Sequence, residues 1–592
     1  MSLALDPAPY RVTAPTWRGR LTWPVFYQHG ILLMVAVAAI TPLAFLILGS
    51  FSTSSIPGDI TLTKLTLSNY RDAWLDSDHL RLFTNTFFYV TGATFIGTSV
   101  AALLAWLVER TDMPFKTLVY AGVPMTLAVP GMLQAMAWVL LLSPRIGFLN
   151  QGLVEVFGLQ AMPLNIYSLW GMVFVEGLRL VPTAFLMLIP LLRSMDPSLE
   201  EAAATCGATP LRAFRRVVMA LMKPGLVAVL IYQAMTALEV FEVPGVLGLP
   251  GSIYVFSTKI YSTLNSASFG PAYGKANALA ILYLVVALIA TALYMRVIAR
   301  SERYSIVTGK GYRPRVQALG RWRHPVLLLV FAFLVLSVVA PFLVLLYISF
   351  LRVLQMPSAE AFASMSLVQY RGLLNNELMG TTLRNTAVMV TVAATATTVI
   401  SFLVSLVIVR SRFWGRKILD NLAFIPHAIP GMVMGLAMLT IFLKIDQFGL
   451  PLFGSIWSIA IAFTISFMSY GTRAMNAAII QIHKDLEEAA MISGAPQWRV
   501  LWRVFLPLLL PSLIGVWIWA MLHAVRIAGT PLILYEGPDN QVLAVMIWNM
   551  WDEGYIPAVG AIGTLLMIFL LVLTLGLRAF GFGRRAQIGA TH

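Results

Sequence analysis

The sequence predicts an all-α polytopic membrane protein with about twelve transmembrane helices in two homologous six-helix halves. Of its 592 residues, 59% are hydrophobic and only 11% are charged, whereas soluble proteins carry about 25% charged residues. Its apolar runs reach the roughly 20 residues that a helix needs to cross a bilayer. Short motifs of the first half recur in the second half at a constant spacing, which indicates a duplicated unit.

The predicted spans form two groups of six. The N-terminal residues 1–24 are polar and basic, and no small-residue cleavage site follows the first apolar run, so we interpret that run as an uncleaved span. Spans are expected in the first half at 30–51, 83–108, 117–142, 164–192, 225–250 and 276–297. Spans are expected in the second half at 325–351, 385–409, 418–443, 454–480, 506–535 and 556–577.

These spans divide the chain into two units joined by a basic linker. The predicted parts are an N-terminal tail at 1–24, a first half at 25–299, a linker at 300–323, a second half at 324–580 and a tail at 581–592. The repeated core is expected at about 83–299 in the first half and at about 383–580 in the second.

The distribution of lysine and arginine predicts the orientation in the membrane. Residues 296–323 carry eight basic side chains against one acidic residue, Glu302, and the short loop 410–417 carries four more. Basic residues collect in cytoplasmic loops. With six spans in each half, this bias places both termini, the linker and the 410–417 loop in the cytoplasm. It also explains the net charge of +15 without a nucleic-acid partner.

Two pairs of short motifs define the repeat. Asn85-Thr86 recurs as Asn385-Thr386, and Pro130-Gly131 recurs as Pro430-Gly431, both with an offset of 300 (385 minus 85). Proline and glycine within a span favour a kinked helix. The next repeated motif has an offset of 287 (488 minus 201), so the second half is 13 residues shorter (300 minus 287). We place the extra residues of the first half in an external segment at 143–163.

The third repeated motif is acidic and rich in alanine. Its first copy is Glu201-Ala202-Ala203, three residues, then Gly207, and its second copy is Glu488-Ala489-Ala490, three residues, then Gly494. Alanine and glutamate favour helix, and glycine ends helices, so each copy predicts a short helix with a C-terminal stop. Paired glutamates are costly within a bilayer, so both helices should lie outside it.

This pattern resembles the EAA loop of permease subunits in binding-protein-dependent ABC importers with the type I fold. The family pattern continues to Ile-x-Leu-Pro. The second copy follows it with Val504-Phe505-Leu506-Pro507, but the first copy has Met219-Ala220 in place of Leu-Pro, so the first half is expected to dock less typically. The resemblance implies which residues couple the permease to an ATPase. They are Glu201, Ala202, Ala203, Gly207, Glu488, Ala489, Ala490 and Gly494.

The resemblance also implies partners and a location. It implies two copies of an ABC ATPase subunit at the loops and an external binding protein, periplasmic or lipid-anchored, that delivers the substrate. It implies a multi-pass protein of the bacterial inner (plasma) membrane, in contact with lipid. The chain has no G-x-x-x-x-G-K-[ST] loop, so we expect no enzyme activity and no cofactor of its own, with ATP and Mg on the partner ATPase. The single cysteine, Cys206, excludes an internal disulfide, and we expect no resident metal.

Ionisable residues inside predicted spans indicate a translocation path. One span holds Glu239 and Glu242, three residues apart and so on one helix face, and another holds His523 and Arg526. The offset of 287 aligns Glu239 with Arg526 (526 minus 239), so we expect them to face each other across a pseudo-twofold axis where the path runs. The alternative is that both pairs lie near the external end and are solvated.

Three other charges in predicted spans are expected to be structural or unpaired. Glu176 and Arg179 are three residues apart and should pair with each other. Arg473 has no partner that the sequence reveals.

The substrate suggested by resemblance is ferric iron. The stretches 237–244 and 254–256 look like those of the ferric-iron branch of fused, two-half permeases. The same machinery could instead carry a polyamine, thiamine or an aminoalkylphosphonate. A different class, an ion-coupled secondary transporter, also has two six-span repeats, but it does not need paired Glu-Ala-Ala loops.

Overall fold

The computed structural model describes most of the chain as helices. The residues described are 25–53, 65–75, 79–193, 202–203, 205–209, 212, 216–217, 219–265, 272–301 and 318–588. The predicted N-terminal tail, most of the basic linker, Glu201 and the last four residues lie outside this set. An isolated β bridge joins Ser52 and Leu65.

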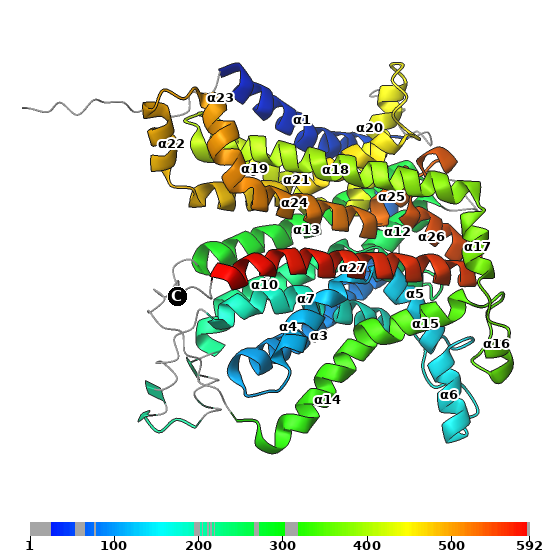
Figure 1. Cartoon of the computed structure of the whole chain (residues 1–592). Coiled ribbons are helices and arrows are strands. Elements are labelled where there is room, and N and C mark those ends of the chain that lie inside the picture. The colour runs from blue at the N-terminus through cyan, green and yellow to red at the C-terminus, as the bar shows by residue number, and fades with distance from the viewer. Residues whose placement is uncertain are drawn as a thin grey trace, which may run out of the picture.

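The first half runs from α1 to α13 and the second from α14 to α27 (Figure 1). The first-half helices are α1 (Val25–Ser50), α2 (Ser68–Trp74), α3 (His79–Arg110), α4 (Lys116–Met125), α5 (Gly131–Leu142), α6 (Phe148–Phe157), α7 (Leu169–Arg193), α10 (Met219–Glu239), α11 (Glu242–Gly248), α12 (Phe256–Leu264) and α13 (Tyr273–Ser301). The second-half helices are α14 (Arg323–Leu334), α15 (Ala340–Ser349), α16 (Ala359–Ala363), α17 (Val368–Leu374), α18 (Glu377–Arg410), α19 (Arg416–Phe424), α20 (Gly431–Asp446), α21 (Ile456–Gln481), α22 (Lys484–Ile492), α23 (Gln497–Val500), α24 (Leu506–Arg526), α25 (Gly529–Leu534), α26 (Leu543–Asp552) and α27 (Ile556–Ile588).

The long helices agree with the predicted all-α membrane fold. Among the described residues, nine helices are long and apolar enough to cross a bilayer, and two bent helix pairs raise the number to eleven. The remaining predicted span, 454–480, is the 26-residue helix α21. Its serine, threonine and arginine residues make it less apolar than the others.

The repeated Pro-Gly pairs break their helices more sharply than a kink. The chain bends by 95° between Lys116–Ala128 and Gly131–Leu142, and by 106° between Arg416–Ala428 and Gly431–Asp446. Proline disfavours helical dihedrals in the residue before it, and the residues before both prolines have extended backbones, with ψ of 116° in one and 111° in the other.

Two spans that the sequence predicts as continuous are broken near the middle of the protein. In the span predicted at 225–250, α10 ends at Glu239 and α11 begins at Glu242. In the span predicted at 506–535, α24 ends at Arg526 and α25 begins at Gly529. Such breaks are tolerated at membrane depth only where protein surrounds them, and the residues at both breaks are largely buried.

The first long helix of each half packs against the other half. Helix α1 contacts α19 and α20 of the second half as well as α13. Helix α15 contacts α5 of the first half as well as α27. Figure 1 shows α1 along one side of the bundle and α14 and α15 along the opposite side. The two halves therefore hold each other through these exchanged helices and through the centre.

Candidate functional site

Both copies of the Glu-Ala-Ala motif end in the same backbone turn. The glycine that closes each copy has a positive φ, +80° at Gly207 and +79° at Gly494. Residues with a Cβ atom are strained at such dihedrals, which explains why the motif requires glycine. The closing hydrogen bonds run from Ala208 N to Ala203 O (2.9 Å) and from Ala495 N to Ala490 O (3.1 Å). This is the Schellman type of helix end.

A buried arginine ties the second motif helix, α22, to the membrane-spanning bundle. The guanidinium of Arg410, the last residue of α18, lies 3.8 Å from the carboxylate of Glu487 in α22. It also donates to the backbone oxygens of Ile479 (2.9 Å) and Ile482 (2.5 Å) at the end of α21. A cation at a helix C-terminus is favourable because the unpaired carbonyls there carry negative charge. Arg410 therefore joins α18, α21 and α22.

The first half contains an equivalent buried arginine at the end of its long helix. Arg110 ends α3, is buried, and donates to Leu192 O at 3.3 Å near the end of α7. Arg110 and Arg410 are related by the offset of 300, and Leu192 and Ile479 by the offset of 287. Sequence reasoning missed this pair of anchors. The signal was an arginine at the end of a long apolar run in both halves.

The outer side of the second motif helix is free of the bundle. Glu488 and Ala489 are exposed, in contrast to the buried Glu487. Close by, Ile492 is 82% exposed and Trp498 is 62% exposed. Large apolar side chains that gather on a surface mark an interaction site. In the first copy Ala202 and Cys206 are likewise exposed, and Glu201 lies outside the described residues.

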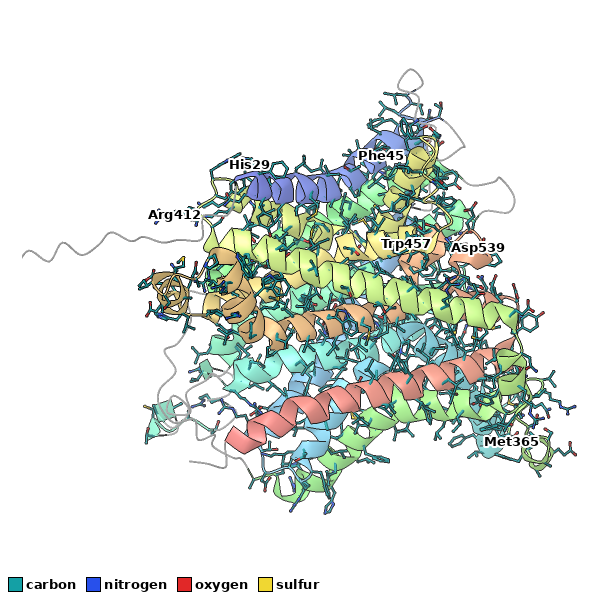
Figure 2. All side chains as sticks on the ribbon, turned by 45° about the horizontal axis from the view of Figure 1, so that its top comes forward. His29, Phe45, Met365, Arg412, Trp457 and Asp539 are labelled. Atoms are coloured by element: carbon teal, nitrogen blue, oxygen red, sulfur yellow. The ribbon has the colours of Figure 1, made fainter. Side chains whose placement is uncertain are left out.

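This surface lies at one end of the molecule. Figure 1 shows α22 and α23 at the end where α27 finishes, whereas α6, α16 and α17 lie at the opposite end. Figure 2 shows His29 and Arg412 at the α22 end, and Met365 and Asp539 at the other. The basic 410–417 loop is thus on the same side as α22.

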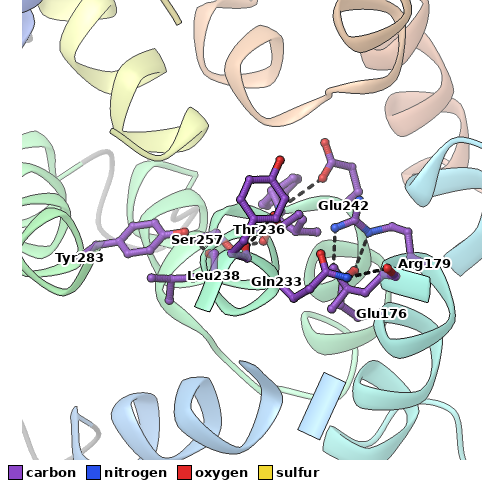
Figure 3. A network of polar contacts seen from close by, with 12 residues as sticks. Glu176, Arg179, Gln233, Thr236, Leu238, Glu242, Ser257 and Tyr283 are labelled. Atoms are coloured by element: carbon purple, nitrogen blue, oxygen red, sulfur yellow. Dashed lines mark hydrogen bonds and ion pairs between the residues drawn. The ribbon is translucent and has the colours of Figure 1, made fainter. Parts of the chain in front are cut away.

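The ion pair expected within one span is present in the centre of the protein. Arg179 donates to both carboxylate oxygens of Glu176 in α7, from Nε at 2.8 Å and from Nη2 at 2.5 Å. Glu176 is fully buried. Glu242 lies beside this pair (Figure 3) and interacts electrostatically with both of its members.

Glu239 and Arg526, which the sequence places opposite each other across the axis, are two described residues that no ion pair joins. Arg526 interacts instead with the charges of Arg179 and Glu242. The reason is the break in the helix, because α10 ends at Glu239 and the turn that follows brings Glu242 toward Arg526. For the same reason Glu239 and Glu242 do not share one helix face. His523 stacks on Trp519, with 4.1 Å between ring centroids.

Glu242 connects the two halves of the protein. Its Oε1 accepts a hydrogen bond from the backbone N–H of Ala528, at 2.8 Å. Ala528 lies in the turn between α24 and α25, so this bond runs from one broken span to its counterpart.

Arg473, whose partner could not be predicted from the sequence, has two contacts. It lies 3.2 Å from the carboxylate of Asp420 and 4.8 Å above the ring of Phe424, both in α19. The partner is 53 residues away in the chain, which is why local spacing did not reveal it.

The described residues contain no group of three or more His, Cys, Asp or Glu side chains placed to hold a metal ion.

Comparison with known proteins identifies the family. The family model described as "Binding-protein-dependent transport system inner membrane component" matches residues 93–303 and 397–582. This chain belongs to that family. As a permease of this family it is a multi-pass inner-membrane protein, and the two matches place one family domain in each half, as the repeated motifs predicted.

Individual relatives carry different transport names. A ferric transport system permease protein of Actinobacillus pleuropneumoniae is 26% identical over 74% of this chain, which covers 62% of that relative's length. A putative ferric transport system permease protein of Haemophilus influenzae is 25% identical, over 79% of this chain and 72% of its own length. A spermidine/putrescine transport system permease protein of Escherichia coli is 24% identical, over 35% of this chain and 76% of its own.

Proposed function

We propose that this permease is the membrane-spanning subunit of an ATP-driven importer that carries ferric iron delivered by an external binding protein. The observation that carries the proposal is the pair of Glu-Ala-Ala helices, which end in the same hydrogen-bonded turn at Gly207 and Gly494 and belong to two copies of one family domain. The names of the two ferric relatives support iron as the cargo.

ATP hydrolysis is assigned to a separate ATPase, of which two copies would bind the two motif helices. The sequence has no phosphate-binding loop of the G-x-x-x-x-G-K-[ST] type. Glu488, Ala489 and Ile492 are exposed on α22 and available to a partner. Glu487 faces inward onto Arg410, so movement of α22 would be passed to the ends of α18 and α21. Rigid helices that are displaced together can rock one half against the other.

The orientation follows from the same surfaces. The α22 end is proposed to face the cytoplasm, because the ATPase works there and because the basic 410–417 loop lies on that side. Both termini are then cytoplasmic, and α6, α16 and α17 face the binding protein outside.

A polyamine is the second candidate for the cargo. It is favoured by the similarity of 35% of the chain to a spermidine/putrescine permease. Thiamine and aminoalkylphosphonate remain candidates from the sequence resemblance alone. An ion-coupled secondary transporter is disfavoured by the family membership, since this family depends on binding proteins.

The test is to reconstitute the permease in liposomes with an ABC ATPase and a binding protein from the same organism, and to measure ATP-dependent uptake of radioactive ferric iron and of spermidine. We expect iron uptake that requires all three components. Uptake of spermidine without uptake of iron would identify polyamines as the cargo. Uptake driven by an ion gradient without ATPase would contradict the importer class.

A further inference from the structure

Three aromatic rings meet where the two halves face each other. Trp548 Nε1 donates to Tyr261 Oη at 3.1 Å, and these two residues differ by the repeat offset of 287 (548 minus 261). Equivalent residues of two related halves can touch only on the axis that relates them. Phe241 packs on both rings, with centroid distances of 5.1 Å to Tyr261 and 5.2 Å to Trp548. This axial contact therefore contains side chains of both halves.

The packing around the axial contact is tight. A Cβ atom on Gly245 of α11 would lie 3.0 Å from the ring of Phe241 and 3.0 Å from that of Trp548. A Cβ atom on Gly529 of α25 would lie 3.4 Å from Cβ of Phe241. The backbones of α11 and α25 thus approach the rings closely.

Glu242, the residue after Phe241, bonds to the other half beside this contact, and the second half makes no equivalent bond to the first. Glu242 of the first half accepts the hydrogen bond of the Ala528 N–H in the second half. The reverse bond is absent because Gly529 stands at the position equivalent to Glu242 (529 minus 242 is 287). A side chain there would meet Met432 Sδ at 3.0 Å from its Cβ. Arg526, two residues before Ala528, adds an attractive charge to the Glu242 carboxylate.

We propose that Glu242 is a one-sided latch, a positioning residue that holds the axial contact closed between transport steps. The proposal rests on the proposed function in one respect, that the substrate crosses between the two halves. Each transport cycle then has to break the bond from the Ala528 N–H to Glu242 before Phe241, Tyr261 and Trp548 can separate.

A disulfide across the axis reports the latch without any substrate. Phe241→Cys with Gly529→Cys, in a Cys206→Ser background, places two Cβ atoms 3.4 Å apart, close to the 3.5–4.5 Å that disulfides adopt. The control pair, Gly92→Cys with Val173→Cys, has Cβ atoms 3.7 Å apart between α3 and α7 of the same half. Disulfide formation is measured in the full chain in membrane vesicles, with oxidant and no added cargo.

The variant that removes the latch is Ala528→Pro. Proline deletes the N–H donor and leaves Glu242 in place. The preceding Ile527 already has an extended backbone (φ −81°, ψ 125°), the conformation that a following proline favours. The φ of Ala528 is −102° and has to shift toward the value of about −65° that proline fixes, so Glu242→Ala is tested beside it. We expect the axial disulfide to form at least several-fold more slowly in Ala528→Pro and in Glu242→Ala. In Glu242→Gln, whose amide oxygen still accepts the bond, it should form at nearly the wild-type rate. The control disulfide should be unchanged in all three.

A second readout leaves the aromatic rings intact. Ala528→Cys places a thiol at a fully buried position, and its labelling by a soluble maleimide should rise several-fold when Glu242→Ala is added but little with Glu242→Gln. Equal disulfide rates and equal labelling in all backgrounds would overturn the latch. Oxidation of the axial cysteine pair should also abolish uptake, and dithiothreitol should restore it. Uptake that persists after oxidation would show that this contact is not on the path. The first two readouts need no cargo, so they hold whether the substrate is iron or a polyamine.

Discussion

At the scale of single residues, the repeated motif is explained by one dihedral angle. Gly494 has a φ of +79°, and its N–H donates to Met491 O at 3.0 Å. A left-handed conformation costs a residue with a Cβ atom about 1–2 kcal/mol. The glutamate beside the motif has a different role from the motif glutamate, because Glu487 is buried on Arg410 and Glu488 is exposed. Sequence reasoning found the motif but could not tell these two acids apart, since both precede Ala489.

We predict that Gly494→Ala weakens the binding of the ATPase and that Gly494→Pro abolishes it, because proline can adopt neither the φ nor the hydrogen bond of this position. Binding is measured by co-purification of the ATPase with the permease. The matched control is Gly554→Ala, since Gly554 has a φ of +84° and equally open surroundings but lies between α26 and α27, away from α22. Equal loss of ATPase in both alanine variants would mean that general destabilisation, and not the motif turn, is responsible.

At the scale of elements, α18 connects the motif helix to the region of the axis. This 34-residue helix is about 50 Å long at 1.5 Å per residue. Arg410 at its end holds α22, and near its beginning Asn385 donates to Asp539 O at 2.9 Å and to Gln541 O at 3.2 Å. Those two residues immediately precede α26, which carries Trp548. In the first half Asn85 donates to Tyr254 O, the equivalent position, at 3.3 Å. The repeated Asn-Thr motif therefore joins each long helix to the segment before α12 or α26.

We predict that Asn385→Ala lowers uptake several-fold and leaves ATPase co-purification unchanged, because it loosens the contact of α18 with the α26 segment without touching α22. The loss of two hydrogen bonds corresponds to about 1–3 kcal/mol. The control is Arg384→Ala, which changes the exposed neighbouring side chain and should transport normally. If Asn385→Ala transports like Arg384→Ala, α18 does not transmit movement through this contact.

The sequence indicates some helix breaks more clearly than others. Pro130-Gly131 and Pro430-Gly431 indicate bends directly in the sequence, because proline lacks the N–H that a continuous helix needs. The breaks after Glu239 and Arg526 carry a less direct signal. Pro244 and Pro531 lie four residues after Val240 and Ile527, so neither carbonyl has a helical donor. Tertiary contacts also stabilise the first of these breaks. Ser257 Oγ donates to Val240 O at 2.9 Å, and Tyr283 Oη donates to Leu238 O. Hydrophobic periodicity cannot reveal partners that come from other helices.

At the scale of the whole molecule, the duplication explains the overall architecture. The deviations from the repeat are found at the centre of the protein. Composition and repeat spacing predicted two related halves, because both are properties of the chain alone. The exchanged packing of α1 and α15 was not predictable, since it depends on which apolar surfaces meet. The charges at the centre are also asymmetric, with Glu242 opposite Gly529 and Glu239 equivalent to Arg526. A symmetric pair of identical charges on the axis would repel, whereas one acid opposite a backbone amide does not.

The last prediction concerns which end of the molecule faces the cytoplasm. Cys206, the single cysteine, is exposed at the first motif turn. Because basic loops stay in the cytoplasm, a membrane-impermeant maleimide should leave Cys206 unlabelled in intact spheroplasts and label it in inside-out vesicles. The matched control is Val156→Cys in a Cys206→Ser background, at a position in α6 that is 78% exposed and lies at the opposite end of the bundle (Figure 1). It should show the reverse pattern. Labelling of Cys206 from outside would invert the topology, and the ATPase could then not reach either motif helix.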